Sequence, residues 1–172
     1  MAAGETNDDA LSDDEMRASL IERVFGGDAR RLENFCAAIR EAVPQAGAVV
    51  LRGSAITGER WKDGAPFDAD GPNTSDLDLT LVGAEPLKLY VPTGFFVPGV
   101  HTRPLSNEDP DIAPELVPLR QRLMAMVGGR PVNIQATRDF VMQLRGDVLG
   151  QPYLTLIGRA DTDASESRDR NG

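Results

Sequence analysis

Two aspartates separated by one residue carry the clearest chemical signal in this sequence. Asp76 and Asp78 belong to the stretch Ser75–Val82, in which polar and apolar residues alternate from Asp76 to Leu81. Such alternation is typical of a β-strand with one polar and one apolar face, so both carboxylates point to the same side. Two carboxylates on one face repel each other unless a cation lies between them. We therefore interpret Asp76 and Asp78 as ligands of a divalent metal ion, since hard cations take oxygen ligands.

A glycine–serine pair precedes the aspartates and follows an apolar run. The run Ala48–Leu51 predicts a buried strand that ends at Gly53 and Ser54, and the residues after it can begin a helix. Gly53 lets a backbone approach a phosphate closely. Ser54 supplies an N–H and a hydroxyl, and a helix N-terminus behind it would favour an anion. The pair is therefore a candidate phosphate site.

This order of elements resembles the nucleotidyltransferases of the polymerase-beta superfamily, from Ala48 to Thr137. In that family a Gly-Ser turn holds the triphosphate of a nucleoside triphosphate, paired aspartates bind magnesium, and a third carboxylate lies on a later strand. The resemblance implies that Asp76 and Asp78 are catalytic metal ligands and that Gly53 and Ser54 bind the nucleotide. It implies Mg²⁺ (or Mn²⁺) as the cofactor, an NTP, with ATP expected, as the donor, and an acceptor that the sequence does not identify.

An asparagine occupies the position of the family's third acid. Asn133 lies in the strand expected at residues 130–137. Its carbonyl oxygen can ligate a cation, but the side chain carries no charge and is not a base. Three outcomes stay open: another carboxylate such as Asp109, Asp111 or Asp139 substitutes, the enzyme runs slowly on two carboxylates, or the domain binds nucleotide without turnover.

Interpretations outside this family are also open. Asp76 and Asp78 can be a solvated strand face, and the chain can be a regulatory module or an antitoxin-like partner in a two-gene system. A serine hydrolase built on Ser54 and His101 is disfavoured, because the sequence has no G-x-S-x-G motif. The G-x-x-x-x-G-K-[ST] motif is absent as well. We expect His101 to be a surface or structural residue.

The segment 59–74 is rich in Gly, Pro, Asp and Asn, which predicts an inserted loop. Its two large aromatic residues, Trp61 and Phe67, could cover a nucleotide base, but we favour packing within the loop. Asp68 and Asp70 form a second D-x-D pair without flanking apolar residues. We expect these two carboxylates to be solvated rather than catalytic.

Composition indicates one globular domain and excludes several classes of function. With 172 residues the chain can bury a substantial core. We expect a disordered acidic tail at 1–12, a single domain at 13–158 and a second disordered tail at 159–172.

The net charge of −9 argues against sequence-independent DNA binding. No run approaches the roughly 20 apolar residues of a membrane span, and no signal peptide is evident, so we expect a cytoplasmic location. One cysteine and one histidine exclude a Cys/His zinc site.

The element pattern predicts an α/β (α+β) fold with a mixed, mainly antiparallel sheet of about five strands flanked by helices. Caps and apolar spacing place helices at about 13–25, 28–43, 111–127 and 139–149. Besides the strands already described, we expect short strands at 89–91 and 95–97 and a last strand at 153–157. The strands that carry Ser54, Asp78 and Asn133 then position the candidate site.

Overall fold

A six-stranded mixed sheet forms the centre of the protein in the computed structural model, which describes residues 11–139, 141 and 149–158. The strand order is β3-β4-β5-β2-β1-β6. The strands are β1 (Ala48–Arg52), β2 (Leu77–Val82), β3 (Phe95–Val97), β4 (His101–Thr102), β5 (Val132–Thr137) and β6 (Tyr153–Gly158). Only the pair β2–β5 is parallel within this sheet. The predicted mixed, mainly antiparallel sheet is confirmed, with one strand more than expected.

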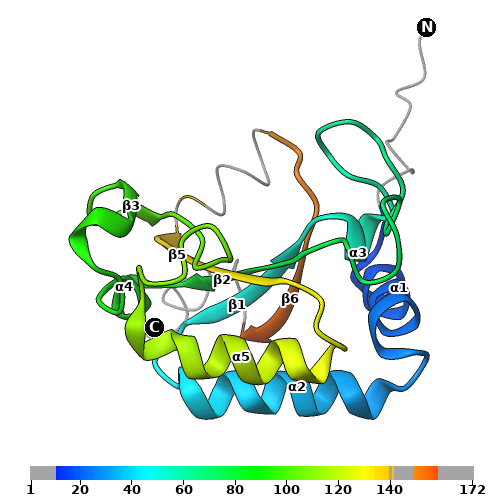
Figure 1. Ribbon diagram of the computed structural model, residues 1–172, viewed down its shortest axis with the longest axis horizontal. Coiled ribbons are helices and arrows are strands. Elements are labelled where there is room, and N and C mark those ends of the chain that lie inside the picture. The colour runs from blue at the N-terminus through cyan, green and yellow to red at the C-terminus, as the bar shows by residue number, and fades with distance from the viewer. Residues whose placement is uncertain (1–10, 140, 142–148, 159–172) are drawn as a thin grey trace, which may run out of the picture.

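Three longer helices pack on one face of this sheet. They are α1 (Asp13–Phe25), α2 (Ala29–Ala42) and α5 (Val117–Met126), and Figure 1 shows α2 and α5 side by side below the strands. The core lies between these helices and the apolar face of the central strands. It includes Val49, Leu51, Leu77, Leu79, Leu81, Val132, Ile134 and Ala136. The alternate residues of β2 and β5 therefore point to the opposite face, where the candidate site lies.

Local capping explains where the first two helices begin. The Ser12 hydroxyl accepts a hydrogen bond from the Glu15 backbone N–H at 3.1 Å, and the Asp28 carboxylate accepts one from the Arg30 N–H at 3.0 Å. Each bond satisfies a backbone donor that a helix start leaves unpaired. Gly26 adopts the left-handed conformation (φ 62°) that ends α1. The predicted extents of both helices are confirmed to within a residue.

The segment between β2 and α5 differs most from the prediction. The strand expected at 89–91 is wrong: these residues follow the short helix α4 (Ala84–Leu87) in a turn, and Val91 donates its N–H to the Ile112 carbonyl at 2.9 Å. β3 pairs with β4, and the 3₁₀ turn η1 (Pro92–Gly94) precedes it. The strand expected at 95–97 is therefore confirmed as β3, whereas the turn at 89–91 depends on a contact with Ile112 that no local pattern predicts.

The helix expected at 111–127 begins later than predicted. A 3₁₀ turn, η2 (Pro114–Leu116), precedes α5, whose first turn contains Pro118. Proline has no N–H to donate and is therefore tolerated at a helix start but not inside a helix. Most of the helix expected at 139–149 lies outside the described residues, as do positions 1–10 and 159–172 of the expected tails. No helix in the described part of the chain is long and apolar enough to cross a membrane.

Candidate functional site

Asp76, Asp78 and Asn133 lie together where the parallel strands β2 and β5 begin. Asp78 is the cross-strand partner of Asn133, and Asp76 immediately precedes β2. The Asn133 side-chain nitrogen donates to Asp76 Oδ2 at 2.9 Å and to Asp78 Oδ1 at 3.0 Å. Two carboxylate oxygens therefore converge on one nitrogen. The Asn133 amide thus lies between the two carboxylates, where we expected a cation.

The two carboxylates differ in their surroundings. Asp76 is exposed and Asp78 is half-buried. Burial raises the pKa of Asp78, and the negative charge of Asp76 adds to this effect, while the hydrogen bond from Asn133 and the positive charge of Arg52 oppose it. Arg52 is the cross-strand partner of Asp78 in β1. The neighbours of Asp78 therefore compensate only in part for the burial of its negative charge.

Position 53 requires a glycine because of its backbone conformation and because Asp78 lies close to it. Its φ of +98° is rarely adopted by other residues, and a Cβ at this position would lie 3.3 Å from Asp78 Oδ2. Ser54, which follows, is buried and begins α3 (Ser54–Thr57). This helix is a single turn of four residues, so the helix dipole expected behind the pair is small. The backbone approach at Gly53 and the N–H and hydroxyl of Ser54 remain as possible contacts for an anion.

Two hollows meet at Asp78. The first, which we call the polar hollow, has a volume of about 200 Å³ and is lined by Ser54, Arg60, Asp70, Thr74, Ser75, Asp76 and Asp78. The second, the Trp61 hollow, has a volume of about 180 Å³. Its walls include Gly53, Thr57, Glu59 and Trp61 on one side and Gln151 and Pro152 on the other. The structure thus brings Ser54, Asp76 and Asp78 to the polar hollow and places Gly53 in the lining of the Trp61 hollow.

The donor set at this site fits a hard divalent cation. Asp76 and Asp78 offer carboxylate oxygens that converge within about 3 Å of one point, and rotation of the Asn133 amide exchanges its N–H₂ for its carbonyl oxygen. Oxygen-only sets of this kind suit Mg²⁺ and Mn²⁺. No group of three or more His, Cys, Asp or Glu side chains suited to a metal occurs among the described residues.

None of the carboxylates considered as substitutes for the third acid joins this group in the described structure. Asp109 accepts hydrogen bonds from Arg103 Nη1 at 3.0 and 3.1 Å. Asp139 follows the opposite end of β5 from Asn133, and Asp111 is exposed in the segment before η2. Among the described residues, no third carboxylate therefore joins Asp76 and Asp78 beside Asn133.

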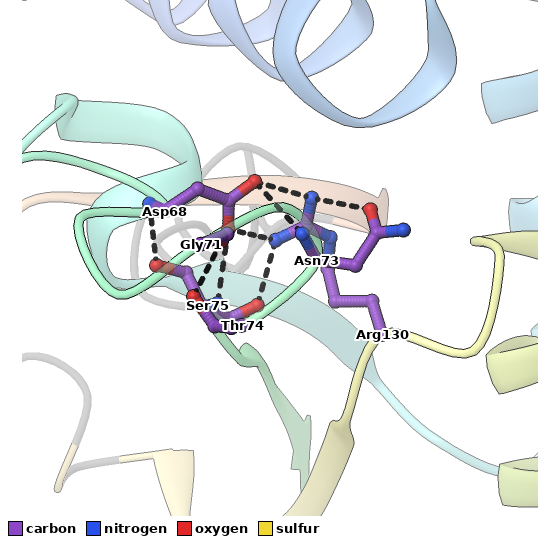
Figure 2. Close-up of polar contacts among 6 residues, drawn as sticks. All are labelled: Asp68, Gly71, Asn73, Thr74, Ser75 and Arg130. Carbon is purple, nitrogen blue, oxygen red and sulfur yellow. Dashed lines mark hydrogen bonds and ion pairs between the residues drawn. The ribbon is translucent and has the colours of Figure 1, made fainter.

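The inserted loop is fastened by a buried arginine (Figure 2). Arg130 is 3% exposed, and its guanidinium donates to Asp68 Oδ1 and Oδ2 at 2.7 and 3.0 Å, to Asn73 Oδ1 at 3.1 Å and to the Ser75 carbonyl at 2.8 Å. The expectation that Asp68 is solvated is therefore wrong, because its carboxylate is half-buried and paired with Arg130. The hydrogen bonds from Arg130 lower the pKa of Asp68 to about 2. Asp70 is exposed and pairs with Arg60 at 3.1 Å.

The two aromatic residues of the loop have different environments. Phe67 packs against the core, with the Arg130 guanidinium 4.5 Å from its ring centroid. Trp61 is 68% exposed and lines the Trp61 hollow. Phe67 therefore holds its loop down against the core, as expected, whereas Trp61 does not.

The histidine lies away from these carboxylates. His101 contacts Thr137, four residues along β5 from Asn133, at 3.0 Å between Nδ1 and Oγ1, and its ring stacks on Phe96. It therefore has structural partners, as expected.

Several residues of the site have no signal in the sequence. Arg130 approaches Asp68 across 62 positions of chain, and Gln151 and Pro152 reach the Trp61 hollow from the segment before β6. An isolated arginine, or a polar residue in a loop, forms no periodic pattern. Only the topology of the sheet brings these residues together.

Comparison with known proteins found no matching family model, no matching curated protein and no matching solved structure. The chemistry that the site supports therefore follows from its own residues and their geometry.

Proposed function

We propose that this protein is a metal-dependent nucleotidyltransferase that moves a nucleoside monophosphate, expected to be AMP, from an NTP to an acceptor. The convergence of Asp76 and Asp78 on one point, in a hollow that also contains Ser54, carries this proposal. Paired carboxylates beside a glycine-containing turn can hold a divalent cation and a phosphate next to each other.

The residues have distinct roles in this proposal. Asp76 and Asp78 would hold Mg²⁺ or Mn²⁺, with Asn133 as a further oxygen ligand. When bound, the metal would stabilise the charge on the attacking and leaving oxygens. Ser54 would contact the triphosphate from the turn at Gly53. Arg60 also lines the polar hollow, but its guanidinium pairs with Asp63 and Asp70, so it would contact the phosphates only by leaving these partners.

The transfer itself exchanges one phosphorus–oxygen bond for another. A hydroxyl oxygen of the acceptor forms a bond to the α-phosphorus, the bond to the β-phosphate oxygen breaks, and pyrophosphate leaves. The hydroxyl proton passes to solvent in this scheme, because Asn133 is not a base. A positioned general base contributes roughly 10²–10⁴-fold to a rate. We therefore expect slow turnover.

A second candidate function is binding of the nucleotide without turnover, as a regulatory module or an antitoxin-like partner. The contacts of Asn133 favour this alternative, because its amide bridges both carboxylates where the family has its third acid. The two functions share the metal and nucleotide contacts and differ only in the release of pyrophosphate.

Calorimetric titration with ATP, with and without Mg²⁺, tests both candidates. The wild type should bind ATP in Mg²⁺, and Asp76→Asn combined with Asp78→Asn should abolish the metal-dependent part. Asp13→Asn combined with Asp14→Asn is the matched control, since it changes the same charge on the exposed start of α1. Equal ATP binding by wild type and the site variant would contradict the proposal. Release of pyrophosphate on addition of lysate as a source of acceptor separates the enzyme from the binding module.

A further inference from the structure

The Trp61 hollow adjoins the proposed phosphate and metal site without having a role in it. We infer that this hollow receives the nucleobase of the bound NTP and that the base stacks on Trp61. The inference rests on the proposed function and adds to it the place and the recognition of the base.

The sizes of the two hollows favour one ligand that spans both. The polar hollow has about 200 Å³ and the Trp61 hollow about 180 Å³. Each is smaller than the roughly 300–1,000 Å³ of pockets that enclose a whole drug-sized ligand. Both are lined by Asp78, and the consecutive residues Gly53 and Ser54 line one hollow each. A ligand that lies across Gly53 and Ser54 would therefore occupy both hollows.

The linings of the hollows decide which part of the ligand each one receives. The polar hollow is lined by the hydroxyl residues Ser54, Thr74 and Ser75, by Arg60 and by three aspartates, Asp70, Asp76 and Asp78. With a divalent cation on Asp76 and Asp78, as the proposed function requires, this lining would suit phosphates. The Trp61 hollow differs in offering the indole of Trp61 and the ring of Pro152, beside polar side chains that include Arg52, Glu59 and Gln151. Flat apolar surfaces of this kind suit a base.

Trp61 is open to such a ligand. Its side chain is 68% exposed. Any of the nucleobases can stack on an aromatic side chain, because each has a π-face. Its loop is held in place by Arg130 through Asp68 and Ser75, so Trp61 belongs to an anchored segment.

Fluorescence tests this inference directly, because Trp61 is the single tryptophan of the chain. The protein is titrated in Mg²⁺ with ATP and, separately, with inorganic tripolyphosphate, which has no base. We expect ATP to quench the emission of Trp61 and tripolyphosphate to bind without quenching. Trp61→Ala should weaken ATP binding roughly 5- to 150-fold in calorimetry. It should leave the affinity for tripolyphosphate unchanged, and Trp61→Phe should retain most of the ATP affinity.

The outcomes separate this inference from the proposed function. If the wild type binds ATP and Trp61→Ala binds it equally well, the base lies elsewhere and the inference is overturned while the proposed function stands. An equal loss of ATP and tripolyphosphate binding in Trp61→Ala would also overturn it, since Trp61 would then act on the phosphate side. If the wild type binds neither ligand, the proposed function fails and the inference fails with it.

Discussion

Replacement of Asn133 by Asp puts a third carboxylate beside Asp76 and Asp78. The change removes both hydrogen bonds that the amide donates to them, at 2.9 and 3.0 Å. In EDTA the variant should be less stable than the wild type. The lost bond to the half-buried Asp78 alone is worth about 1.5–3 kcal/mol, which lowers the melting temperature of a chain of this length by roughly 3–12 °C.

A divalent metal should reverse this loss. A ligand at 100 times its dissociation constant stabilises the folded state by about 2.7 kcal/mol, and three carboxylates should bind Mn²⁺ more tightly than two. The melting temperature of Asn133→Asp should therefore rise more on addition of Mn²⁺ than that of the wild type. If the protein is an enzyme, the added carboxylate can also accept the hydroxyl proton, and release of pyrophosphate should accelerate by up to roughly 10²–10⁴-fold.

Thermal melts in EDTA and in Mn²⁺ measure the first effect, and a pyrophosphate assay with ATP measures the second. Asn133→Ala is the control, because it loses the same hydrogen bonds without gaining an acid. If Asn133→Asp gains no more stability from Mn²⁺ than Asn133→Ala does, the three side chains do not share a cation, and the reasoning is refuted.

The remaining predictions concern the loop and the turn. Because its pKa falls from 3.8 to about 2 on folding, Asp68 should contribute about 2 kcal/mol of stability. This contribution is complete above pH 4 and is lost as the pH falls through 2. In urea unfolding, the free energy of unfolding of Asp68→Asn should therefore be lower than that of the wild type at pH 7, and the difference should be much smaller at pH 2. An equal difference at both pH values would contradict the ion pair. Gly53→Ala should cost more than about 1 kcal/mol in urea unfolding and should weaken Mn²⁺ binding, since a Cβ would crowd Asp78. Gly64→Ala, also at positive φ but with no atom within 4 Å, is its control and should leave Mn²⁺ binding unchanged. Arg130→Met should speed limited proteolysis within residues 59–75, and cleavage at the wild-type rate would show that the arginine does not hold the loop.

Local patterns predicted the parts of the fold that local chemistry decides. The caps at Ser12 and Asp28 need only the adjacent backbone, and both helices begin where these residues predict. The alternation around Asp78 identified β2 and its polar face, because burial of one face enforces a period of two. The position opposite Asp78 in β5 is Asn133, a residue assigned to the site from the family resemblance and not from the strand pattern.

Features that depend on distant residues could not be predicted in this way. The pair of Asp68 with Arg130 joins an inserted loop to the start of β5, and neither residue belongs to a periodic pattern. The turn at 89–91 is held by the Ile112 carbonyl rather than by its own sequence. The apolar run there predicted a strand, but tertiary contacts outweigh propensity in so short a segment.

Crystals soaked with Mn²⁺ and a non-hydrolysable ATP analogue give the most direct test of the central claim. We predict an anomalous scattering peak bound by both Asp76 and Asp78, with the triphosphate of the analogue against Gly53 and Ser54. A manganese peak elsewhere on the protein, or an analogue bound away from this turn, would contradict the proposal that the paired carboxylates form a nucleotide-dependent metal site.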